Sequence, residues 1–517
     1  MKVVVYGKCL NRSEINLSNH AKNNFEDFID YESKYSVGDY LVHIVQEDAD
    51  KFIASSGFSG GYIDSVRVLY EKNISDLMTY NGKPSQDFVF NKIFSLIPEG
   101  FLNPFPDVSL IDSGDVIEIN KAGVVVFNYL IDGIYKKSPF STSYSALINT
   151  LECYTKNFNS ISLMYSGGID SSLILLGLEE IGADFDLITF ERSQTNDNNS
   201  KKSTLMAKRF GHTPRIIDKN AFSRDVNKNY ITDLMRKDFI NPMNPHYDAT
   251  NVGDILLSGQ NADAVIGLDM VKLNDKASWF KTKIRLRQEI LNMWQTDGFL
   301  NINLLSKILG LFEKNYLKTR YCKKNPYFNF DPDKLLSLRT GLDFNSISNL
   351  GLKRKTRLQL ETFNHFSYRA WALRMLSHFP NEGKVNTYLP YNSAPFINYY
   401  NSKSRFLKDS YKPKWRESEV ISKKMGENYY NVISGLDKFD KQSDHQTENF
   451  SLSGLAGTFD KCIASRLLEK YNIKNILYIS EILEDTELLF KKIKSNQLSA
   501  SDLSRVYKYI NLDYLGS

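Results

Sequence analysis

Residues 165–172 read Tyr-Ser-Gly-Gly-Ile-Asp-Ser-Ser and contain the residue types that bind phosphate. Gly167 and Gly168 allow a tight turn that brings backbone N–H groups close to an anion. Asp170 repels phosphate by itself, so we expect it to ligate a magnesium ion that bridges the phosphates. Three serines offer further hydroxyl donors to phosphate oxygens: Ser166, Ser171 and Ser172.

The flanking residues predict a strand before this segment and a helix after it. Residues 160–165 are typical of a strand, and residues 171–181 predict a helix that ends at Gly182. A helix N-terminus adds partial positive charge, which favours a bound anion. The pattern therefore indicates a phosphate loop. The alternative is that its Ser and Asp residues only cap the helix.

Nearly the same letters occur at residues 59–65, Ser-Gly-Gly-Tyr-Ile-Asp-Ser, with one residue inserted. This copy lies between two strand-like runs, where no helix N-terminus is available to hold a phosphate. We predict a hairpin turn there.

Residues 257–264 form a second polar segment at the end of a predicted strand, 254–258. Gly259 permits a close approach of the backbone, and Asp263 supplies a second carboxylate. Two carboxylates facing a triphosphate suit Mg²⁺, so we expect Asp170 and Asp263 to hold the metal beside ATP. The backbone and side chains of the same segment are expected to face the nucleotide: Ser258, Gly259 and Gln260.

Strands and helices alternate from about residue 145 onward. Further strands are predicted at 185–190 and 214–217, with a helix at 200–210 between them. This alternation predicts an α/β fold with a doubly wound parallel sheet, whose ligands bind at the carboxyl ends of the strands.

Residues 1–140 differ from this pattern, because short strand-like runs alternate with turn residues and predict an antiparallel α+β domain. The second domain is then 141–517, mainly helical after about residue 276, with a loop at 435–455. The strands expected in the first domain are 2–6, 39–45, 51–55, 65–70, 115–119 and 123–129, with one helix at 85–96.

Composition sets broad limits. The 517 residues are 42% hydrophobic and carry a formal charge of +5, which is too dilute to indicate nucleic-acid binding. No apolar stretch has the length of a signal peptide or a membrane helix, so we expect a cytoplasmic protein. The four cysteines lie far apart and suggest neither a zinc site nor disulfides: Cys9, Cys153, Cys322 and Cys462.

With both loops in view, the chain resembles the asparagine synthetase superfamily of ATP pyrophosphatases. Residues 166–171 match its SGGxDS signature. The second loop is similar to SGxGxDE but keeps only Asp263 of its acids, since Gln260 and Ala264 stand where acidic residues are usual. Residues 389–391 and 414–417 are similar to later family segments.

The resemblance implies an Ntn-amidotransferase-like first domain and an ATP-pyrophosphatase second domain that adenylates a carboxylate with Mg-ATP. Adenine would be bound through backbone groups at the end of the second parallel strand: Thr189, Phe190 and Glu191. Glutamine-dependent members expose a cysteine nucleophile after Met1, whereas this chain has Lys2, which cannot form a thioester. The first domain is therefore expected to lack glutaminase activity, as in β-lactam synthetase, carbapenam synthetase and lasso-peptide cyclase.

In those relatives a loop lysine stabilises the developing charge, and a Tyr/Glu pair orients the amine. The matching candidates here are Lys441, preferred over Lys438, and the pair Glu361 and Tyr368, with Tyr388 as a third candidate. The basic run at residues 353–357 is either a solvated face or a contact for an acidic substrate.

Three hypotheses for function remain open. The first is an amide-forming ligase that uses a small carboxylate and an amine or ammonia, in surface-polysaccharide or natural-product biosynthesis. The second is a lasso-type peptide macrocyclase, and the third is a non-catalytic ATP-binding regulatory protein. A small-molecule or peptide substrate is expected as partner, without nucleic acid or membrane insertion, and a homodimer is left open.

Overall fold

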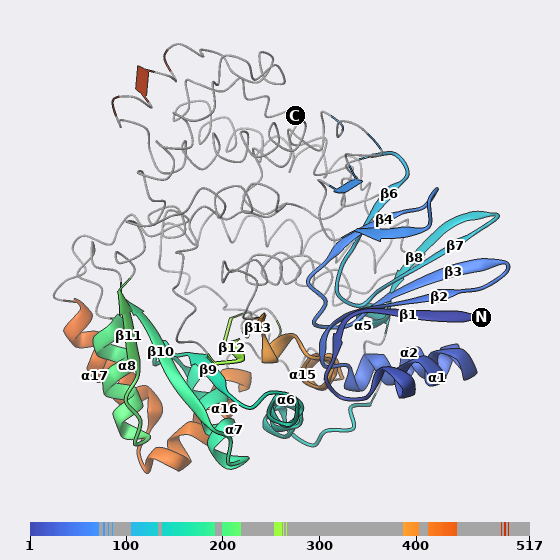
Figure 1. The fold of residues 1–517 in the computed structure, drawn as a ribbon. Coiled ribbons are helices and arrows are strands. Elements are labelled where there is room, and N and C mark those ends of the chain that lie inside the picture. The colour runs from blue at the N-terminus through green and yellow to red at the C-terminus, as the bar shows by residue number, and fades with distance from the viewer. Residues whose placement is uncertain are drawn as a thin grey trace, which may run out of the picture.

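The computed structural model combines helices with parallel and antiparallel sheets, so the α/β class is confirmed (Figure 1). It describes residues 1–71, 105–132, 137–191, 199–218, 253–260, 386–402 and 412–441, and the single positions 76, 77, 81, 85, 262, 265, 488, 491, 492 and 495. The predicted helix at 85–96 lies outside these residues except for position 85.

The amino-terminal module, which comprises the described residues between 1 and 132, contains two antiparallel sheets. The five-stranded sheet has the order β1-β2-β3-β7-β8, with β1 Lys2–Cys9, β2 Gly38–Val45, β3 Ala49–Ala54, β7 Asp115–Asn120 and β8 Gly123–Asn128. The three-stranded sheet has the order β5-β4-β6, with β5 Leu69–Glu71, β4 Gly61–Asp64 and β6 Val108–Ile111. The five predicted strands of the larger sheet are confirmed.

Within the copy of the phosphate-loop letters at residues 59–65, Gly61–Asp64 form strand β4 rather than the predicted hairpin turn. The turn follows it, at residues 65–68, so the strand predicted at 65–70 shortens to β5. Asp64 explains the shift, because its carboxylate accepts the N–H groups of Val66 at 3.0 Å and Arg67 at 2.9 Å and so caps the turn.

Two helices, α1 Glu14–Asn23 and α2 Phe25–Tyr35, were not predicted from the sequence. Ser13 caps α1 by accepting the Asn16 N–H. Buried Glu32 of α2 pairs with Arg12 and accepts a 2.5 Å hydrogen bond from the Tyr40 hydroxyl on β2. This buried contact joins the helix to the sheet.

The parallel sheet has the strand order β11-β10-β9-β12-β13. Its strands are β9 Ile161–Met164, β10 Phe185–Glu191, β11 Arg215–Asp218, β12 Ile255–Ser258 and β13 Asn386–Tyr388. In chain order this is 3-2-1-4-5, in which the direction of winding reverses between β9 and β12. The first four strands were predicted, whereas β13 was not.

Helices join the parallel sheet to the amino-terminal module. α6 Ser143–Asn157 and α15 Ala394–Asn401 contact each other, and α15 also contacts α2 (Figure 1). The other described helices beside this sheet are α7 Ile169–Glu180, α8 Asn199–Arg209, α16 Lys412–Met425 and α17 Tyr429–Lys441.

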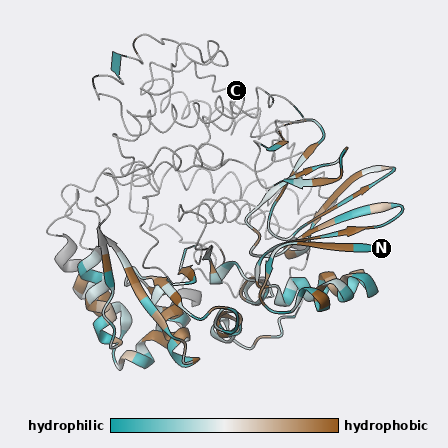
Figure 2. Ribbon diagram, viewed as in Figure 1, coloured by the Kyte–Doolittle hydropathy of each residue, from teal (hydrophilic) through white to brown (hydrophobic). Residues whose placement is uncertain are grey.

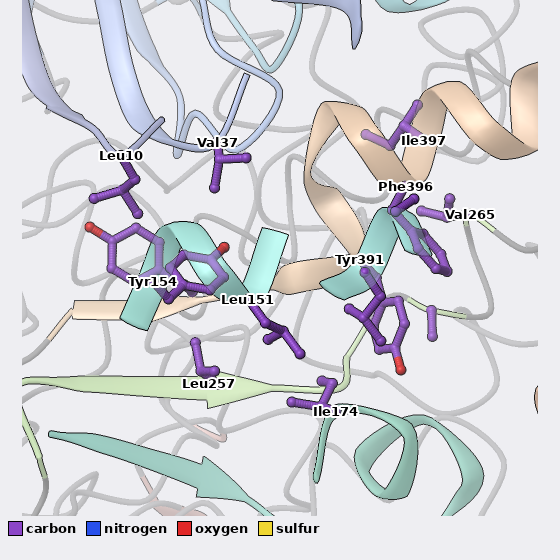
Figure 3. Close-up of a cluster of buried hydrophobic side chains, with 14 of the residues drawn as sticks. Leu10, Val37, Leu151, Tyr154, Ile174, Leu257, Val265, Tyr391, Phe396 and Ile397 are labelled. Atoms are coloured by element: carbon purple, nitrogen blue, oxygen red, sulfur yellow. The ribbon is translucent and has the colours of Figure 1, made fainter. Parts of the chain in front are cut away.

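One hydrophobic core runs through both parts of the chain. Leu10 and Val37 from the amino-terminal module belong to the same buried cluster as Leu257 of β12 and Phe396 of α15 (Figure 3). Apolar residues recur along the strands of the two five-stranded sheets, whereas α1 and α2 carry many hydrophilic positions (Figure 2). Burial of this shared surface stabilises the arrangement of the module against the parallel sheet.

Candidate functional site

The phosphate loop follows β9 directly and leads into α7, as the sequence predicted. Gly168 is the N-cap of α7 and makes no side-chain cap hydrogen bond, so the serines and Asp170 do not act as the cap. The first helical bond runs from the Ser172 N–H to the Gly168 carbonyl at 3.0 Å. The amides of the preceding residues in the first turn therefore lack a helical acceptor and suit an anion.

Gly167 allows the loop to pack against α8. Its φ of +71° is in the left-handed region. A Cβ at this position would lie 3.0 Å from the Ser203 Cα and 3.1 Å from the Lys202 carbonyl oxygen. Both the turn and the close contact require glycine here.

Two of the three serines hold the loop in shape. The Ser171 hydroxyl accepts the Ser166 N–H at 3.3 Å and donates to the Gly168 carbonyl at 3.2 Å. The Ser166 hydroxyl accepts the Gly168 N–H at 3.3 Å, and Ser166 is exposed at the surface of the loop. Ser166 is therefore the serine whose hydroxyl is placed to meet a ligand from solvent.

Ser172 supports the loop from the interior. It is fully buried, and its hydroxyl lies 3.0 Å from the hydroxyl of Tyr165. Burial raises the pKa of Tyr165 to about 12, so this hydroxyl stays protonated at neutral pH. On the neighbouring strand, the Thr189 hydroxyl donates to the Tyr165 carbonyl at 2.8 Å.

The second loop lies against the first turn of α7. β12 pairs with β9 in parallel, with Ser258 opposite Met164, so both loops leave the same edge of the sheet. A Cβ at Gly259 would lie 3.1 Å from the Ser171 nitrogen and 3.2 Å from the Asp170 carbonyl carbon. Both loops thus meet at the point where the strand order reverses, which is where open α/β sheets bind ligands.

Of the two predicted magnesium ligands, Asp170 is described, and it is a half-buried residue in the first turn of α7. Asp263, the second predicted ligand, lies outside the described residues. Among the described residues no group of three or more His, Cys, Asp or Glu side chains could hold a metal ion. A single carboxylate beside a phosphate loop fits a magnesium ion whose other ligands come from phosphates and water.

The next predicted site residues lie either at the end of β10 or outside the described residues. Phe190 and Glu191 end β10, where they pair with Ile217 and Asp218 of β11, and their backbone lies at the carboxyl end of the sheet. Glu361, Tyr368 and the basic run at 353–357 lie outside the described residues.

Lys438 and Lys441 lie in α17, not in the predicted loop. The helix forms because Val432, Ile433 and Leu436 face the hydrophobic core at helical spacing. Residues 435–441 of the predicted loop are therefore helical, and the rest of that loop lies outside the described residues.

Tyr388, the third tyrosine candidate, is buried and lies beside Tyr154, with ring centroids 5.3 Å apart. It lines a small pocket between the amino-terminal module and β13, which is partly open to solvent and has space for about one water molecule. Two buried hydroxyls in the pocket lining, Ser59 Oγ and Thr387 Oγ1, have no hydrogen-bond partner among the residues that the structure describes. Such groups are commonly satisfied by bound water.

Tyr391 lies in the segment 389–391 that is similar to a family segment, but it was not predicted as a site residue. Its hydroxyl donates a 2.6 Å hydrogen bond to the Asp170 carbonyl across a separation of more than two hundred residues. The preceding proline and the aromatic residue types are common in packed corners, so no local pattern indicated this contact.

Lys2 begins β1 and is exposed, whereas Cys9 lies at the other end of the same strand and is buried. An extended strand of this length separates them by roughly 23 Å. The Cys9 thiol donates to Asn11 Oδ1 at 3.1 Å. Cys9 therefore does not occupy the position of an amino-terminal nucleophile.

Among the described residues no helix is long and apolar enough to cross a membrane. Comparison of the whole chain with protein-family models and with curated protein sequences finds no match, so the structure and sequence of the site carry the functional inference alone.

Proposed function

We propose that the protein is an ATP-dependent, AMP-forming ligase that joins a carboxylate to an amine or ammonia. The observation that supports this most directly is the meeting of the phosphate loop and the Gly259 loop at the reversal point of the parallel sheet. The loop sequence at residues 166–171 matches the signature of ligases that release pyrophosphate.

The proposed reaction has two steps. A carboxylate oxygen of the substrate attacks the α-phosphorus of ATP, and the bond to pyrophosphate breaks. The amine then attacks the acyl carbon, AMP leaves with the bonding electrons, and the amine loses a proton. Closing the site against water during both steps protects the acyl-adenylate from hydrolysis.

The first-turn amides of α7 and the Ser166 hydroxyl would bind the β- and γ-phosphates. Asp170, with Asp263 as its proposed partner, would hold magnesium, which supplies charge neutralisation for the departing pyrophosphate. Lys441 or Lys438 would supply positive charge in the second step, and the pair Glu361 and Tyr368 would orient the amine.

The amino-terminal module would be a scaffold of the amidotransferase type. Its antiparallel sheets with α1 and α2 support this part of the proposal. Lys2 at the start of β1 argues against glutaminase activity, because an ammonium group cannot replace a thiolate nucleophile.

The test is pyrophosphate release with a panel of carboxylates, using carboxylates labelled with ¹⁸O. A ligase of the proposed type releases pyrophosphate only with its substrate and transfers one ¹⁸O atom to AMP. Release of ADP with labelled phosphate would show acyl-phosphate chemistry instead, and failure to bind Mg-ATP would refute the proposal. Asp170→Ala provides the matched inactive control.

A further inference from the structure

The peptide unit between Asp170 and Ser171 is contacted at both ends by segments far away in the sequence. At its carbonyl end, the Tyr391 hydroxyl donates a 2.6 Å hydrogen bond to the Asp170 oxygen. At its amide end, the backbone of Gly259 lies so close that a Cβ would be 3.1 Å from the Ser171 nitrogen. Because a peptide unit is planar and rigid, these contacts together set the direction of the Ser171 N–H.

That direction matters because the Ser171 amide belongs to the first turn of α7. The helical bonds begin with the Ser172 N–H, so the Ser171 N–H points toward the amino-terminal end of the helix. The Asp170 carbonyl has two lone pairs and accepts the tyrosine hydroxyl without giving up its place in the helix. The hydroxyl therefore orients the first turn without breaking it.

Tyr391 itself has little freedom to move. It is fully buried in the turn Pro390–Asn392 and packs edge-on against Phe396, with ring centroids 4.8 Å apart. Figure 3 shows its side chain pointing from the corner below α15 toward the helix that carries Ile174, which is α7.

The corner that carries Tyr391 is fastened to two other parts of the molecule. The Ser393 hydroxyl lies 2.7 Å from the Thr150 hydroxyl of α6. The Ala394 N–H donates to the Ser36 carbonyl of the amino-terminal module at 3.1 Å. The position of the Tyr391 hydroxyl therefore depends on the packing of the module against the parallel sheet.

We propose that Tyr391 is a positioning residue of the nucleotide site, which orients the peptide unit 170–171 so that the Ser171 N–H and the Asp170 side chain face the phosphates. This inference rests on the proposed function. It assigns the residue no contact with substrate, since its hydroxyl acts through the Asp170 carbonyl.

The test compares Tyr391→Phe with Tyr129→Phe. Tyr129 is the matched control, because its buried hydroxyl also donates to a backbone carbonyl, that of Ala54 at 2.8 Å, but within the amino-terminal module. Each variant loses one buried hydroxyl and keeps its ring, so both should fold with a similar small loss of thermal stability. Only Tyr391→Phe should weaken Mg-ATP binding, by about fivefold, the factor expected for one hydrogen bond.

Amide hydrogen exchange provides a second measurement that needs no ligand. Exchange in residues 166–175 should be faster in Tyr391→Phe than in the wild type and unchanged in Tyr129→Phe. Equal exchange and equal Mg-ATP affinity in the two variants would overturn the inference. If the wild type itself fails to bind Mg-ATP, the proposed function is wrong, and the exchange data alone decide whether Tyr391 orients the loop.

Discussion

Replacing Gly259 with alanine tests whether the second loop belongs to the nucleotide site. The added Cβ would lie 3.1 Å from the Ser171 nitrogen and 3.2 Å from the Asp170 carbonyl carbon. Both are backbone atoms, so no flexible side chain can move aside. The backbone of Gly259 is outside the left-handed region, so alanine adds a steric conflict and no conformational strain.

The size of the effect follows from this contact. An ordinary carbon contact begins at about 3.4 Å, so one of the loops must shift by a few tenths of an ångström. Overpacking of this kind costs about 1–3 kcal/mol. If bound nucleotide requires the native spacing of the loops, a cost of that size weakens Mg-ATP binding about fivefold to 150-fold.

Two other glycines provide controls for the assay, which combines urea unfolding with equilibrium Mg-ATP binding. Gly57→Ala would place a Cβ 2.6 Å from the Gly38 carbonyl oxygen in the amino-terminal module, so it should lower the free energy of unfolding without changing nucleotide affinity. Gly435→Ala adds a methyl group to α17 with no described atom of another segment within 4 Å and should be neutral or stabilising by up to about 1 kcal/mol. The reasoning is refuted if Gly259→Ala loses stability as Gly57→Ala does but binds Mg-ATP like the wild type.

Four further outcomes are expected. Asp170→Asn and Asp263→Asn should each slow pyrophosphate release about a thousandfold or more with the fold intact in circular dichroism, and near-normal release in either would reject the metal assignment. Lys441→Met should leave Mg-ATP affinity unchanged but stop amide formation, and normal amide yield would place the catalytic cation elsewhere. Burial raises the pKa of Cys153 to about 11, so less of the reactive thiolate is present at pH 7.5. Alkylation of Cys153 at this pH, followed by mass spectrometry, should therefore be on the order of 100-fold slower in the native protein than after unfolding. Equal rates would contradict its burial. Burial alone would raise the pKa of Asp64, but hydrogen bonds from Arg67, Asn81 and Val66 together outweigh it and lower that pKa. The stabilisation is therefore present above the unfolded-state pKa of about 3.9 and is lost as the pH falls through the lower folded pKa. In urea unfolding between pH 2.5 and 6, the free energy of unfolding of Asp64→Asn should fall less steeply toward low pH than that of the wild type. An unchanged slope would exclude that role for Asp64.

Local patterns predicted the parts of the fold whose signals are short and continuous. The four strands β9 to β12 and the helices α7 and α8 follow from apolar runs bounded by glycine, and Gly182 and Gly211 end these helices with positive φ. The capping residues Ser13 and Asn24 were available signals for α1 and α2 and would have identified both helices.

Other features were not predicted because polar residues obscured the hydrophobic pattern of the segment. The segment at 435–441 was predicted as a loop on account of its charged residues, although Leu436 continues the apolar face of α17. Similarly, the nearly identical letters at residues 59–65 and 166–171 have different structures, since only the second copy precedes a helix. Sequence context distinguished the two copies, but the exact position of the turn depended on hydrogen bonds to Asp64.

The sequence by itself determined the strand, glycine-rich loop and helix of the proposed phosphate site, because these residues are neighbours in the chain. Only the tertiary structure brought Gly259 and Tyr391 to the peptide unit between Asp170 and Ser171. The three-residue strand β13 has too few residues to show a periodic signal, and its place beside β12 is set by parallel pairing across a long connection. Contacts of that kind depend on how separate segments pack into one core, and no pattern of neighbouring residues encodes them.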